Sequence, residues 1–414
     1  MNREHFSLGA LALGAIIFCS ESAHAQSIPT PPLTGPPALP AGSDRFSATA
    51  QAEVIYSSNI AGGDATVAAL RGVTPKDIDY DLGTTINLQL PIGREIVFLS
   101  GNVDLQRHDR NSVLNADNYG ITAGGIGHAG ACSGSAIGNV SRIETLAEDL
   151  AIAVTRNIAS QDGINGSVNC GHGAFFVTLQ GGYSKVTNTA LNAGFIDSDT
   201  SNASASIGYH NKTIGDLSVA GQYSKSDYIN QPALAVGQPN GFEQYGVSLI
   251  FSRRIGLRLS GTASVSLQTL KSPATSLLPA STFNNLGSNV DLKYRVSSRL
   301  NLALGYNLSN EASPTVNANF VRVQNIHLSG IYTLNDRISA HLGGYNARSN
   351  FQGGIPIFLQ VQNSEDTEFD GGISVKVGRK IAVTLDANHI NRHADISAFS
   401  FSSDQVTLGL KGTF

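Results

Sequence analysis

The sequence is poor in the residues on which most soluble enzymes and nucleic-acid-binding proteins depend. Among 414 residues there is no tryptophan, one methionine and three cysteines, and only 14% are charged. Three cysteines exclude a disulfide-dense scaffold and any metal site built from four cysteines. A net charge of −4 argues against a basic nucleic-acid-binding surface. Because soluble domains carry roughly 25% charged residues, we expect much of this surface to contact something other than water.

Long apolar runs are also missing beyond the first 25 residues. Arg3, the apolar residues 6–18 and the motif Ala23-His24-Ala25 predict a cleaved signal peptide over residues 1–25. Prolines at positions 29, 31, 32, 36, 37 and 40 predict an extended, Pro-rich periplasmic tether over residues 26–44. After residue 25 no apolar stretch approaches the 18 residues that a transmembrane helix needs.

From residue 45 to the end, apolar and polar residues alternate with a period of two. Over residues 79–90, for example, Tyr80, Leu82 and Ile86 share one face, and Asp79 and Asn87 lie on the other. This alternation is typical of β-strands and not of helices. About eighteen such segments follow one another. The segment 321–333 changes phase near Gln324, which suggests a β-bulge.

The connections between these segments alternate between short and long. Residues 297–298 and 334–336 form short turns, whereas residues 57–78 and 228–242 form long polar loops. An up-and-down antiparallel sheet with tight turns at one rim and loops at the other has this pattern. Strands of about 11 residues, tilted by about 40°, would cover roughly 28 Å along a membrane normal.

The aromatic residues distinguish a membrane barrel from a soluble one. A soluble sandwich or barrel would bury its apolar face and place aromatics centrally, whereas a membrane barrel carries them in two belts at the lipid interfaces. Here the apolar-phase aromatics lie at the strand ends. At the long-loop ends they are Tyr56, Tyr80, Tyr119, Tyr183, Tyr223, Tyr245, Tyr306 and Phe369, and at the short-turn ends Phe46, Tyr209, Phe251, Tyr294, Tyr332 and Phe414.

We therefore predict an all-β fold, with residues 45–414 forming a single closed antiparallel up-and-down transmembrane β-barrel of about 18 strands, or 16 as the alternative. The alternation continues to the last residue, and a terminal Phe414 is typical of the assembly signal of bacterial outer-membrane proteins. The predicted location is the bacterial outer membrane. Its lipid and, during biogenesis, the barrel-assembly machinery are the expected partners.

If the apolar phase faces lipid, the polar phase lines the lumen. The lining is mixed in charge and rich in amides and hydroxyls, and its ionisable candidates are Asp79, Asp81, Asp104, Asp291, Lys293, Arg295, Lys376 and Asp386. These charges can create a transverse field across a constriction, or they can simply pair and solvate the wall. A strongly cationic lining, which would select anions, is not apparent.

Two cysteines remain after the predicted cleavage, and both lie at short-turn ends of predicted strands. Cys132 and Cys170 can form a disulfide in the oxidising periplasm or remain as two free thiols. The surrounding Gly130-Ala131-Cys132-Ser133-Gly134 superficially fits a nucleophile elbow, but a turn between two strands is not the strand-to-helix turn that such an elbow needs. We predict no catalytic, cofactor-binding or metal-binding residue, and no enzyme.

The chain resembles the β-barrel porin 2 family of bacterial outer-membrane proteins. The resemblance rests on the opening strand that ends in Tyr56-Ser57-Ser58-Asn59-Ile60, on the repeated alternating hairpins and on Phe414. It covers residues 45–414 and implies an outer-membrane barrel. Members of the family are often associated with exopolysaccharide production or export.

The expected function is passage of small hydrophilic solutes through a polar lumen, without a cofactor and without nucleic acid. One alternative is an accessory barrel for exopolysaccharide secretion, which would have polysaccharide or periplasmic export components as partners. Another is a structural or adhesive barrel that acts through its loops. Conductance in planar bilayers separates the first two, since open-channel steps favour a pore.

Overall fold

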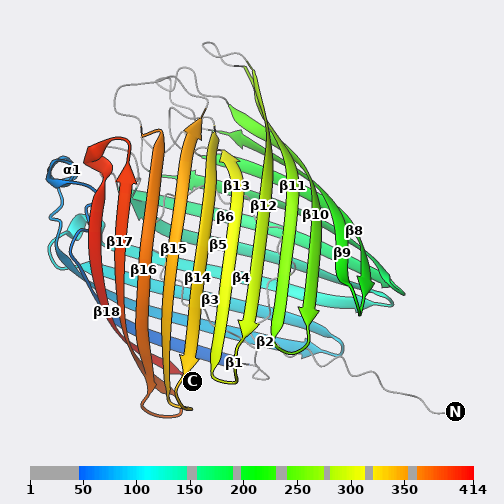
Figure 1. Ribbon diagram of the computed structural model, residues 1–414, viewed down its shortest axis with the longest axis horizontal. Helices are drawn as coiled ribbons and strands as arrows, with labels where there is room; N and C mark the ends of the chain where they lie inside the picture. Colours follow the sequence, from blue (N-terminus) through cyan, green and yellow to red (C-terminus); the bar gives the residue numbers. More distant parts are fainter. Residues whose placement is uncertain are drawn as a thin grey trace.

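A computed structural model describes residues 46–146, 156–189, 197–229, 240–274, 280–312, 320–352 and 361–414. In these ranges the chain forms one 18-stranded antiparallel sheet that closes on itself (Figure 1). The predicted signal peptide and tether lie outside the described residues. None of the helices in the described ranges is both long enough and apolar enough to cross a membrane.

The strands follow the chain in order around the barrel, so each pairs with its neighbours in sequence. Their bounds are β1 Phe46–Ser57, β2 Asp77–Ile92, β3 Glu95–His108, β4 Ala116–Ala129, β5 Cys132–Leu146, β6 Arg156–His172, β7 Phe175–Asn188, β8 Ser198–Asn211, β9 Gly215–Tyr228, β10 Gly241–Ile255, β11 Leu259–Ser272, β12 Ser281–Arg295, β13 Leu300–Ala312, β14 Phe320–Thr333, β15 Ile338–Gln352, β16 Asn363–Lys376, β17 Ile381–Ala394 and β18 Phe401–Thr413.

The first and last strands close the sheet. β1 pairs with β18 in antiparallel register, with Val54 opposite Leu408. At the end of this ladder the backbone of Phe414 exchanges two hydrogen bonds with that of Ala48, at 2.8 and 3.1 Å. This closure confirms the predicted fold class, an up-and-down barrel of 18 strands.

Short turns join the strands at the rim where β1 begins and β18 ends, which we call the short-turn rim. Gly93 between β2 and β3 and Gly256 between β10 and β11 have φ angles of 67° and 61°. Glycine adopts this left-handed conformation without steric cost, which explains its presence in such tight turns. The opposite end is the long-loop rim.

The predicted bulge near Gln324 is wrong. β14 pairs with β13 and β15 without interruption, including the pair Gln324–Arg348. The apolar residues change phase because Val321 and Val323, near the long-loop rim, lie on the inward face, whereas Ile326 and Leu328 lie on the outward face. Near a rim, water can reach the outward face of a strand. Outward residues therefore need not be apolar there.

The outward face of the barrel is apolar. Leu82 is 56% exposed and Leu342 is 72% exposed, and similar values recur at most outward Val, Leu and Ile positions of the strands. Exposed aromatics lie near both rims, such as Tyr80 and Tyr119 near the long loops and Phe46 and Phe414 near the short turns. An apolar band between two aromatic belts is the surface of a membrane-spanning barrel.

At the long-loop rim, segments that are far apart in sequence pack together. The helix α1 (Ala65–Arg71) follows β1, and Asp64 caps it by accepting hydrogen bonds from the backbone of Thr66 and Val67. Two 3₁₀ turns, η1 (Ser112–Leu114) and η3 (Ser397–Phe399), lie nearby. Ala61, Ala68, Val73 and Leu114 form a small buried cluster there. Figure 1 shows α1 beside the outer ends of β17 and β18.

Asp77, the first residue of β2, fastens this packed rim to the sheet. Its carboxylate accepts hydrogen bonds from the Arg110 backbone at 3.0 Å and from Asn111 Nδ2 at 2.8 Å. His108 Nδ1 lies 3.2 Å from the same carboxylate, and both side chains are almost fully buried. Buried polar groups with several partners hold a loop in one conformation.

Candidate functional site: the lumen lining

Along each strand, outward-facing residues alternate with residues that face the lumen and line it. In β2, Tyr80 and Leu82 are exposed on the outside, so Asp79 and Asp81 face inward. The same alternation places every predicted lining residue on the inner face: Asp79, Asp81, Asp104, Asp291, Lys293, Arg295, Lys376 and Asp386. The sequence suggested a mixed lining, but the structure sorts these charges into separate zones.

The first zone is an acidic wall on β1–β3, β16 and β17. Glu53 on β1 lies opposite Asp81 on β2. The carboxyl group of Asp81 also contacts that of Asp104 on β3. One carboxylate oxygen each of Asp79, Asp81 and Asp104 is buried without a hydrogen-bond partner among the described residues. We define the acidic wall as Glu53, Asp79, Asp81, Asp104, Asp370 and Asp386.

His341 on β15 contacts the part of the acidic wall that lies on β16 and β17. Its Nε2 lies 3.6 Å from Asp370 Oδ2 and 3.5 Å from Asp386 Oδ1, and all three side chains are more than a third exposed to the lumen. Sequence inspection missed this contact because the three residues lie on three different strands. Gly372 explains it, since it lies opposite both His341 and Asp386 and has no side chain to separate them.

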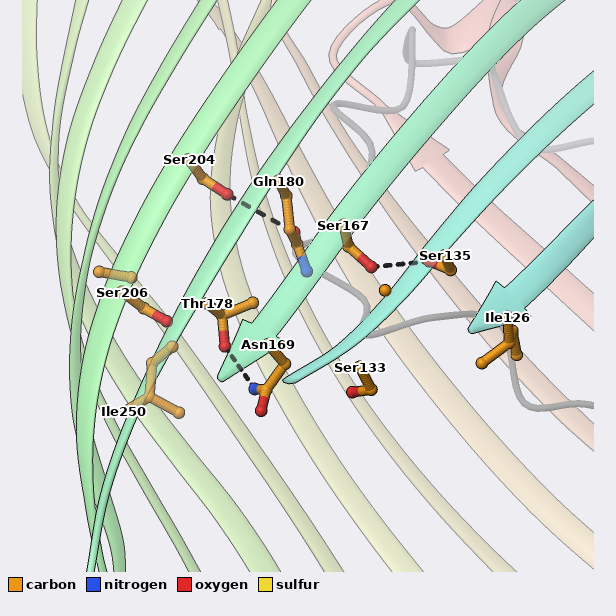
Figure 2. A pocket seen from close by; sticks show the side chains of 12 residues that line it. Ile126, Ser133, Ser135, Ser167, Asn169, Thr178, Gln180, Ser204, Ser206 and Ile250 are labelled. Atoms are coloured by element: carbon orange, nitrogen blue, oxygen red, sulfur yellow. Dashed lines mark hydrogen bonds between the residues drawn. The ribbon is translucent and has the colours of Figure 1, made fainter. Parts of the chain in front are cut away.

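The opposite side of the lumen carries almost no charge. Figure 2 shows a pocket there, lined mostly by short hydroxyl and amide side chains, together with Ile126, Ala220 and Ile250. Ser135 Oγ and Ser167 Oγ are 2.7 Å apart, and Asn169 donates to Thr178 at 2.7 Å. We define the hydroxyl wall as Ser133, Ser135, Ser167, Asn169, Thr178, Gln180, Ser204 and Ser206, on β5–β8. Alternation alone could have assigned these residues to the lumen, but serines at inward positions are too common in such strands to attract notice.

Basic residues gather where the lumen opens at the short-turn rim. Arg254 on β10 and Lys293 on β12 flank Ser260 in the hydrogen-bond register. Arg295 ends β12 and Lys376 ends β16. All four side chains are exposed, and none forms an ion pair with another described residue. We call Arg254, Lys293, Arg295 and Lys376 the basic mouth.

Cys132 and Cys170 lie directly opposite each other on β5 and β6, and their sulfur atoms are bonded at 2.03 Å. They share the outward phase of Val140 and Val168, which are exposed on the lipid side. The disulfide therefore joins two neighbouring strands from the outside, near the short-turn rim. Phe414 also points outward at this rim and is 63% exposed. Its role as an assembly signal stays a prediction.

The histidines and carboxylates of the described residues do not assemble a metal centre. No group of three His, Cys, Asp or Glu side chains in these ranges could hold a metal ion. His108 is buried against Asp77 and Asp79, so a solute in the lumen cannot reach it. His389 contacts Asp404 at 2.7 Å on the outward face, away from the lumen.

No protein-family model matches the chain, and no curated protein matches it in sequence. Several solved structures match its fold. The FrpB iron transporter from Neisseria meningitidis (F5-1 variant) aligns with a TM-score of 0.51 at 8% identity, over 90% of this chain and 83% of that chain. The outer membrane protein OpdK from Pseudomonas aeruginosa aligns with a TM-score of 0.49 at 11% identity, over 89% of this chain and 99% of that chain.

OccAB4 from Acinetobacter baumannii aligns over 91% of this chain and all of that chain, with a TM-score of 0.47 and 10% identity. At such identities the likeness concerns the fold alone. The chain has the fold of an outer-membrane β-barrel. The barrel's apolar outer surface and two aromatic belts agree with the predicted outer-membrane location.

Proposed function

We propose that this outer-membrane barrel is a porin-like protein through which small hydrophilic solutes diffuse. The observation that carries the proposal is the distribution of side chains across one closed sheet: apolar outside, and charged or hydroxyl-bearing inside. A closed sheet of this strand number encloses a lumen wide enough for water and small solutes. Ionised side chains on the inner face are hydrated at little cost only where water fills that lumen.

The two walls suggest which solutes pass. The hydroxyl wall offers donors and acceptors that replace part of a solute's hydration shell, whereas the acidic wall attracts cations and repels anions. We therefore expect neutral and cationic hydrophilic solutes to pass more readily than anions. We assign no catalytic role to the barrel. Membership of the β-barrel porin 2 family, which the sequence resembles, remains part of this proposal.

Cysteine modification during conductance recording tests the proposal. Ser206 on β8 faces the lumen in Figure 2, and its neighbour Ala205 is exposed on the lipid face. The two native cysteines of the barrel are bonded to each other. In planar bilayers we expect reproducible open-channel steps from the unmodified protein. A bulky, water-soluble thiol reagent should lower the conductance of the Ser206→Cys variant and leave the Ala205→Cys variant unchanged.

Absence of conductance steps from correctly folded barrels would overturn the proposal. That result would favour an accessory barrel in exopolysaccharide secretion, in which periplasmic components open the path, or a barrel that acts through its loops. Equal effects of the reagent on both variants would show that the conducting path is not the lumen of this barrel.

A further inference from the structure

The charges of the lumen are separated along the axis of the pore as well as around it. Asp79 and Asp81 lie in the first residues of β2, and Asp104 in the last residues of β3, so all three are near the long-loop rim. The acidic wall thus occupies the outer and middle parts of the lumen. The basic mouth occupies the opposite end, because Arg295 and Lys376 are the last residues of their strands.

The net charge of each zone keeps its sign when the nearest residues of opposite charge are included. Lys411 on β18 lies near Glu53, and Arg392 is held by Asp366 through hydrogen bonds of 2.7 and 3.2 Å. Several carboxylates of the acidic wall remain beyond these two cations. At the basic mouth the inward acids are Asp291 on β12 and Asp216 on β9, and Asp216 contacts His210. Lys293 and Arg295 follow Asp291 on the same face.

The short turns next to the mouth add to its positive charge. Arg258, Arg299 and Arg337 lie in or beside the turns that follow β10, β12 and β14, and all three are exposed. The same turns also carry exposed apolar side chains, such as Leu257 and Leu334. The three turn arginines therefore raise the positive charge of the short-turn rim around the opening of the pore.

We propose that this separation of charge makes the pore a current rectifier, which conducts better when the long-loop side is positive. The inference rests on the proposed function. A negatively charged zone fills with cations from its bath, and a positively charged zone fills with anions from the other bath. With the long-loop side positive, both ions move toward the boundary between the zones and accumulate there. With the opposite polarity both ions leave the boundary, and its conductance falls.

Salt controls the size of this effect. Wall charges act over about 10 Å at 0.1 M salt but over only about 3 Å at 1 M. At 0.1 M salt we expect the currents at equal voltages of opposite sign to differ by about twofold. At 1 M salt the ratio should approach one, because the centre of a wide lumen is then screened from its walls.

Single-channel current–voltage curves of the full-length protein test the inference. A Ser298→Cys substitution in the turn after β12 gives the orientation of each channel, because a maleimide-linked polymer in one chamber reacts only when the short-turn rim faces that chamber. The combined Arg254→Gln, Lys293→Gln and Arg295→Gln variant should rectify clearly less than the unmodified protein at 0.1 M salt, because Lys376 and the turn arginines keep part of the positive charge. The control is Lys271→Gln, which removes a cation on the outward face near the long-loop rim, beside Tyr245, and should leave the rectification intact.

Two results would overturn the inference while leaving the proposed function standing. One is a linear current–voltage curve at 0.1 M salt in the unmodified protein. The other is rectification that is as strong in the triple variant as in the unmodified protein, or that has the opposite polarity. If no variant conducts at all, the proposed function fails first and the inference falls with it, so the two failures are distinguishable.

Discussion

The two halves of the barrel differ in their lining and in the features that hold them together. The half formed by β15–β18 and β1–β3 carries the acidic wall, and packed loops around Asp77 fasten it at the long-loop rim. The half that carries the hydroxyl wall is joined near the short-turn rim by the Cys132–Cys170 bond. The lumen lining and the stabilising contacts can thus differ between two halves of one barrel, although the hydrogen-bonded ladders are the same throughout.

Removing the disulfide, which joins two strands of the hydroxyl-wall half, should have the largest effect on stability. The bond spans 38 residues in sequence, and a loop of that length corresponds to about 3–4 kcal/mol in the chain-entropy model. The Cys132→Ser and Cys170→Ser double variant should therefore unfold at lower urea concentration, as followed by circular dichroism in detergent. Reduction of the wild-type protein should reproduce the change. An unchanged unfolding midpoint would show that the β5–β6 ladder alone fixes these strands.

A pair of lysine substitutions on β8 tests the assignment of its two faces. Ala205 lies near the middle of the strand on the lipid side, so Ala205→Lys should lower the free energy of unfolding by about 2–4 kcal/mol. Ser206→Lys places the same charge in the aqueous lumen and should leave stability nearly unchanged, while it shifts ion selectivity toward anions. Urea titration and reversal potentials measure the two effects. Equal destabilisation by both lysines would contradict the assignment.

Neutralising the acidic wall should have a smaller effect, seen in selectivity and not in folding. The Asp81→Asn and Asp104→Asn double variant removes the negative charge of two carboxyl groups that contact each other and should lower the cation-to-anion permeability ratio by about twofold. Reversal potentials across a salt gradient measure this ratio. The matched control is Ser135→Asn, a change between neutral polar side chains on the hydroxyl wall. A ratio that stays the same in the double variant would show that solutes do not sense the acidic wall.

Period-two alternation was enough to predict the closed barrel and its strand number. It was less reliable at strand ends: the sequence indicates the fifth strand only over residues 137–147, whereas β5 begins at Cys132. It also misled at β14, where Val321 and Val323 face inward near the rim and imitate a bulge. Alternation depends on contact with lipid, so its signal weakens where a strand extends beyond the apolar band.

Alternation cannot predict which side chains contact one another in the lumen. Period two gives the face of each residue, so the inward phase of Asp81, Asp104 and Lys293 could be assigned from the sequence. The contact of Asp81 with Asp104, and of His341 with Asp370 and Asp386, depends on how far each strand is shifted against the next. That shift is set by the geometry of the turn that joins each strand pair and by the shear of the closed sheet, and alternation alone specifies neither.

The pairing of β1 with β18 has a consequence for how the chain acquires its structure. Val54 finds its partner Leu408 only after nearly the whole polypeptide has been delivered, so the contact of greatest sequence separation completes the sheet. Until then, the strands form an open ribbon with two unsatisfied edges, and such edges invite pairing with other chains. A protein truncated before Phe401 would keep both edges permanently, and we expect it to aggregate in the periplasm.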